Sequence, residues 1–267
     1  MTDSKVVIIT GGTFGIGRQI SIALAERGHH VTAFGLDAAQ QSSTAEGSVH
    51  SLRKEIAELG LDIDVLEADV TDASAVAGVV GHSLSRHGRI DALVNNAAVG
   101  PLGTILDTEE ELFDRIMAVN LKGPYLCSRA VLPHLIERGG GSIVNIGSGA
   151  GWGKPNMAAY AASKGGVFAL SAATAYDFLH DRIRVNTVVP GGGGIISGMS
   201  LGRVGGDIAN IDKSAPGSAA GRPVTGTDMA NVVAFLISDE AAAISGTVID
   251  VGCFANQGGP VKRKDTK

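Results

Sequence analysis

Two side chains that can move a proton stand one helical turn apart. Tyr160 and Lys164 are four positions apart in a stretch whose spacing predicts a helix over Met157–His180, so both share one helix face. A free tyrosine has a pKa of about 10, too high for a base at neutral pH, but a nearby ammonium favours the phenolate. The pair indicates acid–base chemistry, although this spacing alone is weak evidence.

A glycine-rich turn, TGGTFGIG over Thr10–Gly17, follows the first predicted strand. Glycines let the backbone approach a pyrophosphate, and the N-terminus of the following helix offers free N–H groups and a positive dipole end. A plain tight turn is the alternative, but the position directly after a strand favours a nucleotide site. The residues expected to contact the nucleotide are Gly11, Thr13, Phe14, Gly15, Ile16 and Gly17.

Asp37 lies twenty residues beyond Gly17, just after the second predicted strand. A carboxylate there accepts hydrogen bonds from the adenosine ribose hydroxyls and repels a 2′-phosphate. Neither the glycine turn nor the segment Gly35–Gln41 contains Arg or Lys. Both observations favour NAD over NADP, the alternative being that Asp37 is only a solvated turn residue.

Strand and helix patterns alternate along the whole chain. This alternation predicts a single-domain α/β fold, a doubly wound parallel sheet (Rossmann fold) of about seven strands with helices on both faces. The predicted strands are Val6–Thr10, His30–Phe34, Ile63–Ala68, Ala92–Asn95, Ser142–Ile146, Arg184–Val189 and Thr247–Val251. The predicted helices are Ile16–Arg27, Ser48–Leu59, Ala73–His87, Glu109–Ile136 (bent near Gly123-Pro124), Met157–His180 and Thr227–Ile237.

Seven motifs, taken in order, resemble the short-chain dehydrogenase/reductase family over nearly the whole chain. Besides the glycine turn, they are Asp69-Val70, Asn95-Asn96-Ala97, Val119-Asn120, Ser148, Tyr160-Ala-Ala-Ser-Lys164 and Pro190-Gly191. The sequence departs from the family at Ala98, where a glycine is usual, and this puts the shape of that loop in doubt. No metal is expected.

The resemblance implies a role for each matching residue. Tyr160 would be the general acid/base, Lys164 would hold the nicotinamide ribose and lower the tyrosine pKa, and Ser148 would orient the substrate oxygen. Asn120, otherwise a satisfied core amide, would hold a proton-relay water. Asp69 would contact the adenine, unless it serves only as a turn before a helix capped by Thr71 or Asp72. Val70, Asn96, Ala97, Pro190 and Gly191 would line the cofactor groove.

The expected domain organisation is one NAD(P)-binding unit over residues 1–255, a substrate lid around 191–220 and a tail over 256–267. Positions near the reacting carbon, such as Val99, Ala150 and Met157, are apolar, which favours an apolar or cyclic secondary alcohol. Trp152 either contacts that substrate or fills the core. The resemblance implies subunit contacts through the two long helices, so a homotetramer is expected, with a dimer as second choice.

Composition excludes several classes of protein. The chain has 267 residues, of which 44% are apolar and 18% charged, unlike a disordered polymer. A net charge of −5 argues against a nucleic-acid binder. No apolar run reaches the ~20 residues that span a bilayer, and the N-terminus shows no signal-peptide pattern. Cys127 and Cys253 lie far apart, as expected for reduced thiols in a cytoplasmic protein.

The expected function is therefore an NAD-dependent oxidoreductase that interconverts a secondary alcohol and a ketone. A 3-oxoacyl-carrier-protein reductase using NADPH is the alternative within the family. A non-catalytic dinucleotide sensor on the same fold remains open, although a sensor has no need of Ser148, Tyr160 and Lys164. A methyltransferase would explain the glycine turn but not the tyrosine–lysine pair.

Overall fold

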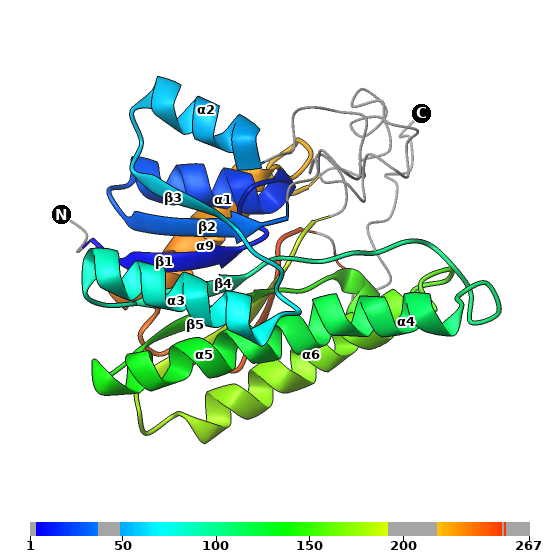
Figure 1. The fold of residues 1–267 in the computed structure, drawn as a ribbon. Helices are drawn as coiled ribbons and strands as arrows, with labels where there is room; N and C mark the ends of the chain where they lie inside the picture. Colours follow the sequence, from blue (N-terminus) through cyan, green and yellow to red (C-terminus); the bar gives the residue numbers. More distant parts are fainter. Residues whose placement is uncertain (1–3, 37–48, 192–217, 253, 255–267) are drawn as a thin grey trace.

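A seven-stranded, fully parallel sheet forms the centre of the protein (Figure 1). The computed structural model describes residues 4–36, 49–191, 218–252 and 254. The strand order is β3-β2-β1-β4-β5-β6-β7, so the direction of winding reverses between β1 and β4, where ligands of such sheets bind. The strands are β1 (Val6–Thr10), β2 (His30–Gly35), β3 (Ile63–Glu67), β4 (Ala92–Asn95), β5 (Gly141–Ile146), β6 (Ile183–Val189) and β7 (Val248–Asp250).

Helices cover both faces of this sheet, as the alternation predicts. Successive strand residues point to opposite faces: Val7 and Ile9 of β1 pack under α1 and α9, whereas Ile8 packs with α3 and α5. The helices are α1 (Gly15–Glu26), α2 (Val49–Leu59), α3 (Ala73–His87), α4 (Glu110–Met117), α5 (Gly123–Glu137), α6 (Ala158–Asp177) and α9 (Gly226–Ile237). Two short 3-10 turns, Gly149–Trp152 and Asp239–Ala241, were not predicted.

The helix predicted over Glu109–Ile136 is interrupted. A π-helical segment, Ala118–Lys122, separates α4 from α5, and the Gly123 N–H bonds to the Ala118 carbonyl five residues earlier. Pro124 has no N–H, so it cannot bond to the carbonyl of Asn120 four residues before it. The widened turn therefore lies just before the predicted bend at Gly123-Pro124, and Asn120 is inside it.

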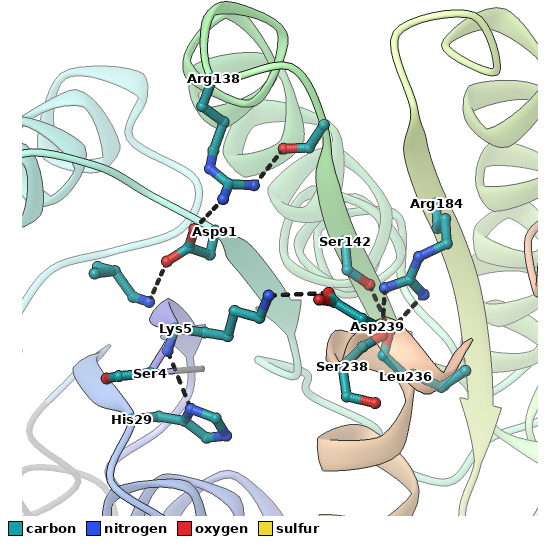
Figure 2. A network of polar contacts seen from close by, with 12 residues as sticks. Ser4, Lys5, His29, Asp91, Arg138, Ser142, Arg184, Leu236, Ser238 and Asp239 are labelled. Carbon is teal, nitrogen blue, oxygen red and sulfur yellow. Dashed lines mark hydrogen bonds and ion pairs between the residues drawn. The ribbon is translucent and has the colours of Figure 1, made fainter. Parts of the chain in front are cut away.

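Charged side chains tie the strands together at their amino ends, as Figure 2 shows. The Asp91 carboxylate, just before β4, accepts a 2.6 Å hydrogen bond from the Val6 N–H and pairs with Arg138 at 2.7 Å. Lys5, just before β1, pairs with Asp239 at 3.0 Å. This network holds the sheet at the end opposite the glycine turn, so the carboxyl ends are left for a binding site.

No helix in the part of the chain that the structure describes is long and apolar enough to cross a membrane. Cys127 is a free, buried thiol on α5, and burial raises its pKa to about 12. This thiol is therefore unreactive at neutral pH. Cys253, Asp37 and most of the predicted 191–220 lid lie outside the described residues.

Candidate active site

A cavity of about 410 Å³ opens at the carboxyl ends of the strands. Its wall combines the ends of β1 to β6 and the segments directly after them with residues of α4, of the π-helical segment and of α6. The predicted site residues that line it are Gly11, Thr13, Phe14, Gly15, Ile16, Asp69, Val70, Asn96, Ala97, Tyr160, Lys164 and Pro190. The predicted residues Gly17, Asn120, Ser148, Trp152 and Gly191 do not line it. The folded sheet thus brings the glycine turn and the tyrosine–lysine pair to one cavity.

The glycine turn has a shape that only glycines allow. Gly11 and Gly15 have φ angles of +59° and +56°, which side chains rarely adopt. A Cβ on Gly17 would lie 2.1 Å from the Gly11 carbonyl oxygen. The Asn96 amide donates to that same oxygen at 3.0 Å. Gly17 therefore lets α1 approach the turn closely. Asn96, directly after β4, holds the turn in place through its hydrogen bond to Gly11.

The N-terminus of α1 faces this cavity. Phe14 occupies the N-cap position without a side-chain hydrogen bond to the helix, and the first turn holds no acidic residue. The first N–H groups of a helix need a partner, and their positive dipole end favours an anion. The turn and the helix end together form a cradle that fits the pyrophosphate of a dinucleotide.

Two aspartates just after β3 have different partners: Asp69 binds Thr71, and Asp72 caps α3. One Asp69 carboxylate oxygen accepts hydrogen bonds from the Thr71 N–H at 2.8 Å and the Thr71 hydroxyl at 2.9 Å. Asp72 caps α3 by accepting from the Ser74 N–H at 2.8 Å. Asp69 is therefore not needed as a helix cap, and its carboxylate is held in a fixed position on the cavity wall.

Tyr160 and Lys164 are buried on the inner face of α6, with 5% and 3% of their surface exposed. The Lys164 Nζ lies 5.9 Å from the centroid of the Tyr160 ring and donates a 2.8 Å hydrogen bond to the Ile146 carbonyl. Burial lowers the pKa of Lys164 to about 8. The Lys164 side chain is thus held near the Tyr160 ring. Because burial disfavours the charged ammonium, Lys164 gives up its proton more readily than a lysine in water does.

Ser148 stands at the edge of the cavity, next to Gly147, which lines it. Its hydroxyl accepts a 3.2 Å hydrogen bond from the Ala150 N–H and so starts the short turn Gly149–Trp152. Trp152 in that turn is 39% exposed, and its ring lies 4.8 Å from that of Phe168. The tryptophan packs on α6 and neither fills the core nor lines the cavity.

The Asn120 side chain is fully engaged. Its carbonyl oxygen accepts from the Val99 N–H at 2.8 Å, and its NH₂ donates to the Val99 carbonyl at 2.8 Å and to the Ser163 hydroxyl at 3.1 Å. It is completely buried. Asn120 is a satisfied core amide, and its expected role in holding a proton-relay water stays a prediction.

Arg115 lines the same cavity, although it belongs to none of the sequence motifs described above. It is an exposed side chain on α4, three and four residues before Ala118 and Val119, which also line the cavity. The helical spacing that joins these three positions was the available signal. Within the described part of the chain, no acidic side chain forms an ion pair with Arg115.

Known proteins resemble this chain along most of its length. The family model for short chain dehydrogenase matches residues 5–199. A 2-(S)-hydroxypropyl-CoM dehydrogenase of Xanthobacter autotrophicus is 36% identical, over 93% of this chain and 95% of its own length. Two solved structures are also similar. One is an actinorhodin polyketide ketoreductase variant with NADPH, 30% identical over 96% of this chain and 99% of its own, with a TM-score of 0.83.

The other is a 3-ketoacyl-(acyl-carrier-protein) reductase of Brucella melitensis complexed with NADH, 31% identical over 94% of this chain and 97% of its own, with a TM-score of 0.78. Relatives with either coenzyme thus share the fold described above. The matched segment contains the glycine turn, the cavity wall and the tyrosine–lysine pair. This chain belongs to the short-chain dehydrogenase family of oxidoreductases, whose members bind a nicotinamide dinucleotide.

Proposed function

We propose that this protein is an NAD-dependent dehydrogenase that interconverts a secondary alcohol and a ketone, with Tyr160 as the general acid/base. One observation carries the proposal. The buried Tyr160–Lys164 pair lines the same cavity as the glycine turn and the open N-terminus of α1. A nucleotide held at the turn would extend toward the phenol, so binding and proton transfer would meet in one place.

The chain's own residues would hold the cofactor at three points. The Gly11–Gly17 backbone and the first N–H groups of α1 would bind the pyrophosphate. The Asp69 carboxylate would accept a hydrogen bond at the adenosine end, and Lys164 would donate to the ribose at the reactive end. Hydride transfer is the chemistry that the nicotinamide supplies when bound.

The protein then has one proton to manage. In alcohol oxidation, the Tyr160 phenolate would accept the proton of the substrate hydroxyl, and in ketone reduction the phenol would return it. The ammonium of Lys164, 5.9 Å from the ring centroid, would favour the phenolate form. Ser148, at the cavity edge, would donate a hydrogen bond to the substrate oxygen and orient it.

Apolar surroundings at this end support an apolar substrate. Met157 and Ala150 pack against Tyr160 in a small buried cluster. Val99 and Ala98 line the adjoining cavity wall. A charged or phosphorylated substrate would lose hydration against these apolar side chains, whereas an aliphatic or cyclic secondary alcohol would not.

The preference for NAD is supported by Arg18, the basic residue directly after the glycine turn. Its guanidinium pairs with Glu55 of α2 and donates to Ser51 at 3.2 Å. A guanidinium whose charge is met by a carboxylate attracts a 2′-phosphate less strongly. The expected contribution of Asp37 to the same preference stays a prediction.

A second candidate is a 3-oxoacyl-carrier-protein reductase that uses NADPH, and Arg115 is the observation that favours it. This exposed cation lines the cavity and would offer a counter-charge to the 2′-phosphate of NADPH. The reductase of Brucella melitensis shows that a relative with a carrier-protein substrate is as similar to this chain as the polyketide reductase.

We further propose a homotetramer built through α5 and α6. Tyr125 of α5 is 48% exposed and borders a second hollow of about 630 Å³, whose lining is mostly apolar. Its wall comprises Asp114, Met117, Ala118, Leu121, Lys122, Tyr125, Gly166 and Leu170. A paired copy would remove this apolar surface from water.

The test is a coenzyme and substrate assay on the purified protein. Oxidation of 2-butanol, cyclohexanol and 1-phenylethanol is followed by NADH or NADPH absorbance, and reduction of acetoacetyl-CoA by its loss. Turnover of the secondary alcohols with NAD supports the proposal. Turnover only of acetoacetyl-CoA with NADPH would establish the second candidate, and no turnover with any pair would contradict both.

A further inference from the structure

Ser163 connects two parts of the site that lie far apart in sequence. It is completely buried on α6, between Tyr160 and Lys164. Its hydroxyl donates a 2.8 Å hydrogen bond to the Tyr160 carbonyl oxygen and accepts a 3.1 Å hydrogen bond from the Asn120 amide. The one hydroxyl therefore ties the backbone of the tyrosine to the π-helical segment before α5.

The connection continues to the cavity wall. The Asn120 amide exchanges two 2.8 Å hydrogen bonds with the backbone of Val99, in the loop after β4. Both Val99 and Tyr160 line the cavity. A hydrogen-bonded chain, Val99–Asn120–Ser163–Tyr160, therefore joins two residues of the cavity lining, and its two middle members are completely buried.

We infer that Ser163 is a positioning residue that sets the distance between Tyr160 and the wall at Val99, where the proposed substrate would lie. The inference rests on the proposed dehydrogenase function. Without the Ser163 hydroxyl, α6 keeps its apolar packing but loses its direct link to Asn120. Tyr160 can then shift relative to Val99, and a misplacement of about 1 Å can lower the rate of an alignment-dependent step by about 10²-fold.

Ser171 provides a matched control on the same buried face of α6. Its hydroxyl donates to the Val167 carbonyl at 2.7 Å and accepts from the Asn145 amide at 2.8 Å. It is 2% exposed. Ser171 thus makes the two bonds that Ser163 makes, to a helix carbonyl and from an asparagine amide, but two turns further from Tyr160. It also accepts a 2.9 Å hydrogen bond from the Thr187 hydroxyl. The two serines differ in what they position and little in their chemistry.

The experiment compares Ser163→Ala, Ser163→Cys and Ser171→Ala in the full-length protein. Each is assayed with NAD and the secondary alcohol that the wild type oxidises fastest. Thermal unfolding and NADH affinity are measured alongside. We expect Ser163→Ala to lower kcat about tenfold with little change in NADH affinity, and Ser163→Cys, whose thiol is a weak donor of similar size, to fall in between. Ser171→Ala should keep wild-type kcat while losing comparable stability.

The outcomes separate the inference from the function beneath it. If kcat falls equally in both alanine variants, or in neither, Ser163 is a structural residue and the inference is wrong while the dehydrogenase function stands. If Ser163→Ala does not fold, a wild-type kcat for Ser163→Cys likewise overturns the inference, and a reduced one at unchanged stability supports it. A wild type that oxidises no secondary alcohol with NAD overturns both.

Discussion

The amine of Lys164 donates a 2.8 Å hydrogen bond to the carbonyl oxygen of Ile146, the last residue of β5. The bond joins α6 to the end of a central strand. It also fixes one of the three donors of the ammonium and so leaves the others to face the cavity that both residues line. The hydrogen bond to the Ile146 carbonyl thereby offsets part of the free-energy cost of burying the Lys164 ammonium.

Replacing Tyr160 with Phe should separate binding from chemistry. The phenyl ring keeps the packing against Met157 and Ala150 but has no proton to exchange. We expect kcat for alcohol oxidation to fall by about 10²–10⁴-fold, with NADH affinity by fluorescence titration within a few-fold of wild type. Unchanged turnover would refute the assigned role of Tyr160.

Lys164→Met should alter the pH dependence of stability in the protein without cofactor. Burial lowers the Lys164 pKa from 10.5 to about 8. Between these values the unfolded chain binds more protons than the folded one, so wild-type stability rises with pH. Relative to Lys164→Met, the free energy of unfolding should increase by about 2 kcal/mol from pH 7.5 to 9.5. Urea titrations at both pH values measure this, and a decrease would contradict the burial effect.

Gly17→Ala should disable the glycine turn. The new methyl would lie 2.1 Å from the Gly11 carbonyl oxygen and 2.4 Å from the Asn96 amide, so α1 or the turn must move. We expect NADH affinity to fall at least about tenfold and stability to drop by about 1–3 kcal/mol. Gly81→Ala in α3 is the control, because nothing lies within 4 Å of its Cβ position. It should bind NADH normally and be equally or slightly more stable.

Arg115→Ala tests which coenzyme the cavity selects. If NAD is the natural coenzyme, kcat/KM with NAD should stay within about threefold, while residual activity with NADP should fall, since the cavity would lose a cation that attracts the 2′-phosphate. Arg129→Ala, an exposed arginine of α5 outside the cavity, should change neither. A wild type that prefers NADP and loses that preference in Arg115→Ala would favour the NADPH-dependent reductase.

Tyr125→Glu tests the proposed subunit contact. A carboxylate at the mostly apolar hollow that Tyr125 borders would lose much of its hydration if two copies paired there. We expect the variant to sediment as a smaller species than the wild type, with its circular dichroism unchanged. Equal sedimentation of both proteins would place any subunit contact elsewhere.

The sequence sufficed for the order and location of the elements. All seven strands and the helices of the described part lie within a few residues of their predicted positions, because apolar periodicity and glycine placement are local signals. The break before α5 was only partly predictable. Gly123-Pro124 indicates a bend, but the five-residue widening at Ala118–Lys122 depends on what the freed turn packs against.

Local motifs also located the glycine turn and the Tyr160–Lys164 pair, because helical spacing alone places both side chains on one face. Only the tertiary structure decided what each polar group bonds to. In the folded protein the Asn120 amide is hydrogen-bonded to Val99 and Ser163, and Trp152 packs against Phe168. Arg115 lies in the cavity wall. These partners come from other strands and helices, so their distances depend on how the helices pack across the sheet, which no short segment of sequence specifies.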